Sequence, residues 1–398
     1  MSGKAVLNVL LRATLLVCFS IGNAGADLFD DLEVHGFATQ GYVKTSANSF
    51  FGDSESGSFD FRELGVNASF EPTPYLRLSG QLLSRKAGDM SDGSVHVDFA
   101  LADFSLISTP MFKFDVIFGR VKNPIGFYND ARDVAFTRPS IFLPQTVYFQ
   151  SVRSLALSAD GIAVRTGFFP TWGNFELQVG VGDPIVDENV EYAYLGDSFS
   201  GDFEETGSSW IGRLLYSSPN EKWRFSVSGA FVTLDFSPRG GDLLPPGVVD
   251  IPYVVFSGQY LSEKWALTVE YVNEAVEYHD FYGSPLSGLT PVLEGYYGQF
   301  NWMPNPGLEL FVRYEEGFYD TADRSGRKFS ALTGLPAFSR FHKAHAVGVR
   351  WDIAPDIEVR AEFQKTDGTL TLSNKENESP FAAKRGWNMW SLLASYRF

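Results

Sequence analysis

Polar and apolar residues alternate with a period of two along many short stretches of this chain. The alternation is strict over residues 357–364 and, apart from Phe311 and Ile117, also holds over residues 308–315 and 112–118. Because successive side chains of a β-strand point to opposite faces, each such stretch predicts a strand with one apolar and one polar face. Read in this way, the chain predicts sixteen strands, over residues 32–45, 59–70, 75–84, 94–107, 111–121, 155–169, 174–182, 209–216, 223–234, 252–261, 265–276, 292–302, 308–316, 343–353, 357–366 and 387–398.

The connections between these strands alternate between tight turns and long excursions. The tight turns, rich in Pro, Gly and Asn, are residues 71–74, 108–110, 170–173, 217–222, 262–264, 303–307 and 354–356. The long connections are residues 46–58, 85–93, 122–154, 183–208, 235–251, 277–291, 317–342 and 367–386. Short turns at one end and long loops at the other are typical of an antiparallel transmembrane β-barrel. A soluble sandwich also alternates along its strands, but its Greek-key connections do not give this regular difference.

Aromatic residues support the barrel. Five tryptophans flank or occupy the tight turns, as expected for a girdle at a membrane interface: Trp172, Trp223, Trp265, Trp302 and Trp351. The chain ends in WNMWSLLASYRF, in which Phe398 and the residues at every second position before it, back to Trp390, are apolar. This stretch resembles the closing strand of bacterial outer-membrane barrels. We therefore predict an all-β fold, a 16-stranded antiparallel transmembrane barrel with short periplasmic turns and long outer loops.

The first residues predict export. Lys4 and Arg12 precede the apolar run 13–21, and Ala24-Gly25-Ala26 provides small residues for cleavage after Ala26. We expect residues 1–26 to be a signal peptide and residues 27–398 to form the barrel in a bacterial outer membrane. The only cysteine, Cys18, lies in the predicted signal, which excludes disulfides and thiol catalysis from the mature chain. No later segment reaches the roughly 20 apolar residues of a spanning helix.

Composition narrows the function further. The chain is 15% aromatic with 38 glycines, as suits β structure, and its net charge of -16 argues against a nucleic-acid partner. Sixteen strands enclose a lumen too wide to be filled by barrel side chains alone. We expect a porin that passes small hydrophilic solutes by passive diffusion, with no cofactor and no bound metal.

The longest connection, 122–154, is the candidate constriction. Lys122, Arg132, Arg138 and Arg153, set against Asp130 and Asp133, leave it net positive in an acidic protein. The segment GRVKNPIGFY, residues 119–128, resembles the strand-to-loop segment of the phosphate-selective O and P porins and their dicarboxylate-type relatives. The resemblance implies a third loop folded into the lumen and a homotrimer. The chain lacks the run of lumen lysines and arginines that the phosphate-selective members imply, so phosphate itself is left open.

The polar faces of the strands supply candidate pore-lining charges. These are Arg77, Lys113, Arg165, Arg213, Arg224, Arg313, Arg350 and Arg360, with Glu358 and Glu362 among the carboxylates beside them. Charged rings at a constriction select ions by their field, so we expect a weak preference for anions such as phosphate or small carboxylates. The alternative is that many of these arginines only brace the loop by pairing with lumen carboxylates.

Other functions have weaker support. Residues 183–208 carry eight carboxylates and no Lys or Arg, so a divalent cation bridging to lipopolysaccharide is conceivable, although the spacing is irregular. A barrel lipase or protease is one alternative, but His342 and His345 would point to opposite faces of a strand and no nucleophile elbow occurs. A plugged, substrate-specific transporter is another, and the early first strand argues against an amino-terminal plug.

Overall fold

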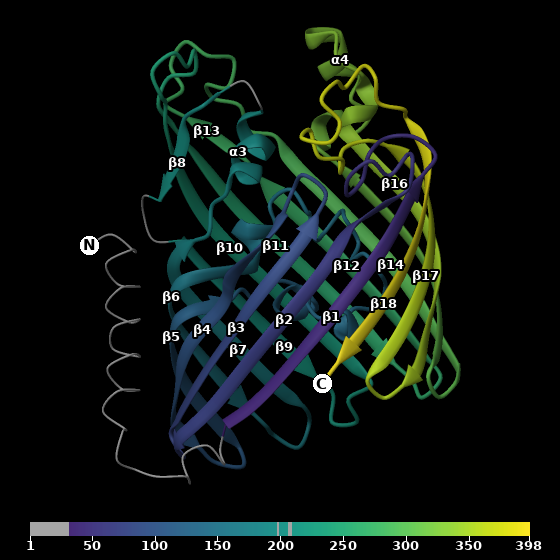
Figure 1. Cartoon of the computed structure of the whole chain (residues 1–398). Helices are drawn as coiled ribbons and strands as arrows, with labels where there is room; N and C mark the ends of the chain where they lie inside the picture. Colours follow the sequence, from purple (N-terminus) through teal and green to yellow (C-terminus); the bar gives the residue numbers. More distant parts are fainter. Residues whose placement is uncertain (1–31, 197–198, 206–208) are drawn as a thin grey trace.

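The computed structural model describes residues 32–196, 199–205 and 209–398, so the predicted signal segment, 1–26, lies outside the described residues. The described chain is a closed, tilted sheet of antiparallel strands (Figure 1). Its strands are β1 (Leu32–Thr45), β2 (Ser58–Thr73), β3 (Leu76–Ala87), β4 (Asp92–Ser108), β5 (Phe112–Lys122), β6 (Ser158–Phe168), β7 (Asn174–Pro184), β8 (Asp202–Glu205), β9 (Ser209–Ser217), β10 (Trp223–Ser237), β11 (Gly247–Leu261), β12 (Trp265–Ala275), β13 (Glu277–His279), β14 (Val292–Asn305), β15 (Leu308–Phe318), β16 (Phe341–Ala354), β17 (Ile357–Gly368) and β18 (Gly386–Arg397).

These segments form a barrel of sixteen strands, as predicted. Segments β8 and β9 both pair along β10, and β12 and β13 both pair along β11, so each couple is one interrupted strand. The cylinder closes where β1 pairs with both β2 and β18. Closure matters physically because it leaves no unpaired strand edge, which a lipid environment cannot satisfy.

The closing strand has the two faces that its sequence predicted. Trp390, Leu392 and Phe398 are exposed on the outer surface, whereas Met389 and Leu393 are buried inside. The backbone N–H of Phe398 donates to the carbonyl of Gly36 at 3.0 Å, and Gly36 donates back to Phe398 at 3.1 Å. The last residue is therefore bonded into the first strand and completes the ring of hydrogen bonds.

The two ends of the barrel differ as expected, with tight turns at one end and long loops at the other (Figure 1). Several of the predicted limits were wrong. Residues 85–93 are not a long loop, because β3 continues to Ala87 and β4 begins at Asp92. Strands β10 and β11 also extend beyond their predicted limits into 235–251.

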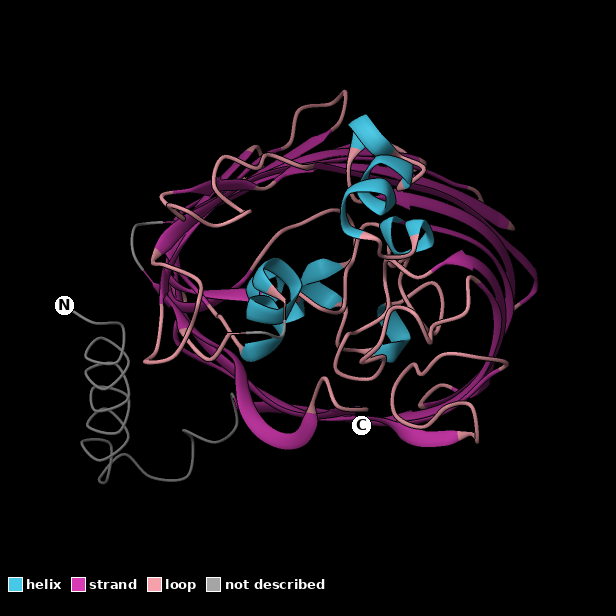
Figure 2. Cartoon of the chain, turned by 90° about the horizontal axis from the view of Figure 1, so that it is seen from above, coloured by secondary structure: helices cyan, strands magenta, loops and turns pink. Residues whose placement is uncertain are grey.

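The long loops contain short helices that the alternation did not predict. They are η2 (Asn129–Ala131), η3 (Ala135–Thr137), α2 (Arg153–Leu157), α3 (Glu188–Leu195), η4 (Thr321–Asp323), α4 (Arg327–Thr333) and η5 (Ala337–Arg340). The first strand residues predicted after the third loop, 155–157, therefore belong to a helix instead. Seen from above, helices and loops project over the opening enclosed by the strands (Figure 2), although α4 stands beyond the strand ends at the long-loop end (Figure 1).

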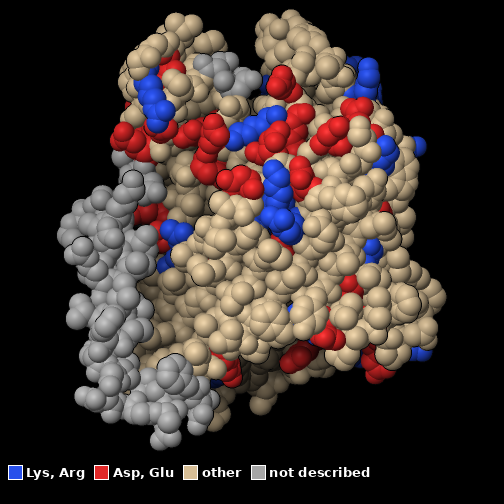
Figure 3. Space-filling model, viewed as in Figure 1, with Lys and Arg blue, Asp and Glu red and all other residues tan. Residues whose placement is uncertain are grey.

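The outer surface carries an apolar band and aromatic rings near the tight turns. Trp223 packs on Tyr260 with ring centroids 4.6 Å apart, and Tyr260 packs on Trp265 at 4.8 Å. Trp172, Trp302 and Trp351 are exposed there as well. On the face shown in Figure 3, charged side chains gather toward the long loops above a broad uncharged zone. No helix in the described ranges combines the length and hydropathy needed to cross a membrane.

Candidate functional site

The third loop, residues 123–157 between β5 and β6 and hereafter loop 3, runs through the lumen and is bonded to distant parts of the wall. The N–H of Gly126 donates to Ser228 Oγ of β10 at 2.8 Å, and the N–H of Ile141 donates to Glu362 of β17 at 2.9 Å. Between them, the N–H of Thr146 donates to Glu315 of β15 at 3.2 Å. Loop 3 therefore crosses the interior and narrows it.

Two wall arginines hold the middle of loop 3. Arg360 of β17 donates to the carbonyls of Ala135 and Arg138 at 2.7 Å and of Ser140 at 3.1 Å, and it forms a bidentate pair with Glu358. Arg313 of β15 donates to the carbonyl of Phe142 at 3.0 Å. Planar guanidinium groups bind several oxygens at once, so each arginine fixes a length of irregular backbone.

A charge network holds the ends of loop 3 together. Lys122 Nζ donates to Asp98 Oδ1 and Asp133 Oδ2 at 2.5 Å each, and Arg153 pairs with the other oxygen of Asp133. Burial raises the pKa of Asp133, but Lys122 and Arg153 outweigh burial and hold that pKa well below the ordinary range. The carboxylate thus stays ionised and ties the start of the loop to its end.

Further arginines gather where loop 3 meets β2 and β3. Arg138 forms a pair with Glu63, with Nη2 and Oε2 2.9 Å apart, and Arg85 lies 3.4 Å from the same carboxylate. Arg132 is 1% exposed and donates to Asn129 Oδ1 and to the carbonyl of Tyr148. Among the described residues, no carboxylate oxygen lies within 4.0 Å of its guanidinium nitrogens.

The predicted constriction residues fall into two places. Lys122, Arg132, Asp133, Arg138 and Arg153 meet at the junction of loop 3 with β2, β3 and β4, where all but Lys122 are buried. The remaining residue, Asp130, pairs with Arg213 of β9 at 3.1 Å. Their part in selectivity remains a prediction.

The predicted pore-lining charges also divide by burial. Arg313, Arg360, Glu358 and Glu362 are buried against loop 3. Solvent reaches the remaining predicted charges, which are Arg77, Lys113, Arg165, Arg213, Arg224 and Arg350. Arg165 pairs with Asp103 and Asp115, and Arg224 lies over the ring of Phe127 with Cζ 5.1 Å from its centroid. The accessible charges are therefore mixed in sign.

Sequence reasoning did not identify Glu63 and Arg85. Arg85 was assigned to a long loop although β3 continues to Ala87, so its lumen-facing position was not recognised. Glu63 occupies an inward position on β2 that alternation could have identified, and alternation did place Glu315 on the polar face of its strand, but without a role at loop 3. The contacts that they make with loop 3 depend on tertiary structure alone.

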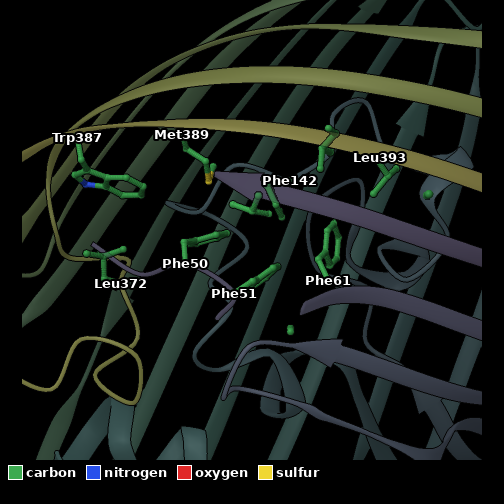
Figure 4. Packing of buried hydrophobic residues seen from close by; sticks show 12 residues of the cluster. Phe50, Phe51, Phe61, Phe142, Leu372, Trp387, Met389 and Leu393 are labelled. Carbon is green, nitrogen blue, oxygen red and sulfur yellow. The ribbon is translucent and has the colours of Figure 1, made fainter. Parts of the chain in front are cut away.

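Apolar side chains also fill part of the lumen. Phe50 and Phe51 from the first loop and Phe142 from loop 3 pack on Phe61 and Met389 of the wall (Figure 4). On another side, a cavity of about 90 Å³ lies between loop 3 and strands β6, β7, β9, β10 and β11. It exists because the wall presents small residues there, among them Gly161, Gly180 and Ala230.

No cluster of side chains suggests metal or hydrolytic chemistry. Among the described residues, no three His, Cys, Asp or Glu side chains come together as metal ligands would, including in the described part of 183–208. In that loop Asp187 instead caps α3 by accepting from Asn189 and Val190. His342 is buried and bonded to Thr371, and His345 is exposed on the outer face, so the two do not form a site.

Comparison with known proteins supports the fold. No protein-family model matches the sequence, and no match was found among curated proteins. Several solved structures are similar. The outer membrane channel DcaP of Acinetobacter baumannii is 14% identical, with 95% of this chain and 99% of that chain covered and a TM-score of 0.57. OmpT, an outer membrane protein of Vibrio cholerae in a trimer form, is 16% identical over 92% and 99%, with a TM-score of 0.56.

An anion-selective porin from Comamonas acidovorans is 12% identical, covers 92% of this chain and 98% of its own, and gives a TM-score of 0.53. At these identities the likeness concerns architecture alone. The closed antiparallel cylinder, its loop-filled lumen and these similarities together give this chain the fold of the bacterial outer-membrane porins, with sixteen strands.

Proposed function

We propose that this chain is an outer-membrane porin through which small hydrophilic solutes diffuse, with loop 3 as the constriction. The observation that carries the proposal is the division of the two barrel faces. Large apolar side chains such as Val312 and Leu392 are exposed outside, while ionised groups such as Arg313 and Glu362 point inward. An apolar exterior suits lipid and a polar interior suits water.

The bracing of loop 3 supports its role as a constriction. A loop that only covered the pore would need few bonds to the wall, whereas this loop is held by Arg360, Arg313 and Glu362. Such anchoring fixes the width of the passage. On this proposal Lys122, Arg132, Asp133, Arg138 and Arg153 act on permeation by shaping the loop, and Asp130 with Arg213 borders the passage.

We further propose a weak preference for anions such as phosphate or small carboxylates. Solvent reaches several basic groups on the inner wall, and the side chain of Arg165 is 43% exposed. Nearby carboxylates, including Asp103 and Asp115, reduce the positive field, which is why the expected preference is weak. Membership of the phosphate-selective O and P family belongs to the same proposal and is supported by residues 119–128.

Planar-bilayer recording tests the channel. Purified protein is expected to insert and to give stepwise conductance, and a salt gradient should give a reversal potential of the anion-preferring sign. Conductances in chloride, phosphate and succinate then rank the solutes. No conductance from correctly folded, heat-modifiable protein would contradict the porin proposal, whereas a cation-preferring reversal potential would contradict only the anion preference.

The proposed partners follow from the location. We propose that lipid and lipopolysaccharide surround the barrel, since Lys343 and Arg324 lie near its long-loop end beside Glu316 and Glu294. A homotrimer is proposed by analogy with the trimer form of OmpT, and light scattering in detergent tests it. The alternative of a barrel lipase or protease predicts hydrolysis of ester or peptide substrates by the purified protein, for which we expect no activity above that of a detergent blank.

A further inference from the structure

A small cavity lies where loop 3 meets β2 and β3, and arginines line it. Arg85 of β3 and Arg132, Arg138 and Arg153 of loop 3 and α2 all line it, together with Glu63 of β2. All four arginines are buried, with exposures between 1% and 8%. Buried charges require compensation, so the balance of this cluster decides what the cavity can hold.

The carboxylates within reach do not balance the cations. Glu63 is shared by Arg85 and Arg138. Asp133 is shared by Arg153 and Lys122, while Lys122 also contacts Asp98. Arg132 adds a further cation, and burial next to Arg153 lowers its pKa. Counting the groups in these contacts leaves the cluster with more positive than negative charge.

Donors at the cavity are also unused. The Nε–H groups of Arg132 and Arg138 are buried and have no hydrogen-bond acceptor among the described residues. The Nε of Arg85 lies 3.4 Å from Glu63 Oε1 but is not aligned for a hydrogen bond. Leaving a buried donor of a charged group unsatisfied is unfavourable, so these donors, on residues that line one cavity, indicate an acceptor that the polypeptide itself does not supply.

The size of the cavity limits the acceptor. Its volume of about 10 Å³ is small, on the scale of the space that holds one water molecule. A monatomic anion, somewhat larger than water, fits with small shifts of the surrounding side chains, whereas a phosphate or sulfate with its shell of oxygens does not fit without movement of loop 3. Water would satisfy the donors but would leave the excess positive charge uncompensated.

We propose that the arginine cluster of Arg85, Arg132, Arg138 and Arg153 binds one halide ion, chloride under ordinary conditions, which locks loop 3 against β2 and β3. The ion accepts from the unused Nε–H groups and offsets the excess charge. This site is buried behind loop 3 and is separate from the accessible wall charges such as Arg165. Binding is therefore structural, and it does not depend on the protein being a channel.

The test measures the unfolding temperature of the folded protein in detergent while sodium gluconate is replaced by sodium chloride at constant ionic strength. Gluconate is too large for the cavity. A ligand that binds only the folded state stabilises it by an amount that grows with its concentration relative to its dissociation constant. We expect a saturable rise with chloride and with bromide. Sulfate matched in ionic strength should give only the gradual, non-saturating rise of a salt that is excluded from the protein surface.

Two variants of the Glu63–Arg85 pair should change the affinity for halide in opposite directions. Arg85→Gln removes a cation and a donor and should weaken halide binding about tenfold or more, because it removes a charge-assisted contact to the ion. Glu63→Gln removes a competing negative charge and should strengthen binding, even if the variant is less stable overall. Arg385→Gln, at an exposed arginine paired with Asp367, should keep the wild-type response and serves as the control.

The proposal is overturned if the unfolding temperature of the wild-type protein does not change with halide concentration. It is also overturned if chloride and gluconate give the same unfolding temperature. A Glu63→Gln protein that binds halide no better than wild type also contradicts it. If Arg85→Gln does not fold, the wild-type titration and Glu63→Gln still decide. Crystals grown in bromide give a second readout, with an anomalous peak expected between Arg85, Arg132 and Arg138 and its absence counting against the site.

Discussion

Arg360 is the strongest single attachment of loop 3 to the wall, and its removal should release the loop. The guanidinium donates to three loop carbonyls, those of Ala135, Arg138 and Ser140, at 2.7–3.1 Å and neutralises buried Glu358. Removing one partner of a buried ion pair typically costs about 3–5 kcal/mol. These interactions share one guanidinium group, so their separate contributions do not add. We therefore expect Arg360→Met to destabilise the bound loop by that amount in total.

Trypsin provides an assay that does not depend on channel function. Buried Arg132 and Arg153 are potential cleavage sites inside loop 3. At 1.4 kcal/mol for each factor of ten, the loss should raise the population of the released loop, and hence the rate of cleavage there, by about 10² to 4 × 10³. Intact-mass analysis of the fragments identifies the cleaved bond.

Two further variants distinguish the loss of hydrogen bonds to the loop from the cost of a buried carboxylate that has lost a partner. Glu358 also pairs with Arg350 at 3.0 Å, so Arg360→Met leaves this carboxylate one cationic partner. In Arg360→Met/Glu358→Leu the carboxylate is gone, but the loop carbonyls remain without their donor, so cleavage should still exceed that of wild type. Arg385→Met removes an exposed arginine bonded to Asp367 outside loop 3 and should leave cleavage unchanged. Wild-type cleavage kinetics in Arg360→Met would refute the view that this arginine holds the loop.

Three other predictions concern permeation, pH and packing. Replacing partly exposed Arg165 with Gln should shift the reversal potential in a salt gradient toward cations, and an unchanged potential would remove Arg165 from the selectivity proposal. The pKa of Asp133 is depressed, so its contribution to stability is complete above its ordinary value of 3.8 and is lost only as pH falls through the lower folded value. Protein incubated at each pH between 7 and 4 and probed by proteolysis should therefore show no release of loop 3. Release within that window would argue against the network around Asp133. The side chain of Gly180→Leu would project into the 90 Å³ cavity, where a Cβ would lie 3.4 Å from that of Ala163, and should lower conductance while leaving folding intact. Gly298→Leu, on the outer face, is the control. Equal conductance of the two variants would show that the cavity is not part of the solute path.

The sequence alone determined the barrel, its two faces and its two ends. Alternation is a local property, since each residue faces the side opposite to its neighbours, and the strand ending in Phe398 shows it without any knowledge of its partners. Turn composition is local as well, which is why the tight turns were located accurately. The exception at 85–93 arose where polar residues, including Arg85, continue a strand whose inner face is already polar.

Only the tertiary structure decided how the lumen is used. The contacts that define loop 3 join residues far apart in the sequence, up to 225 positions for Arg360 with Ala135, and no local pattern carries that information. The same holds for the burial of Arg132 and for Glu63, which bonds to Arg138 across 75 positions. A lumen-facing charge is polar whether it meets water or loop backbone, so alternation identifies the face on which it lies, and only the packed loop decides whether it lines a passage or braces the protein.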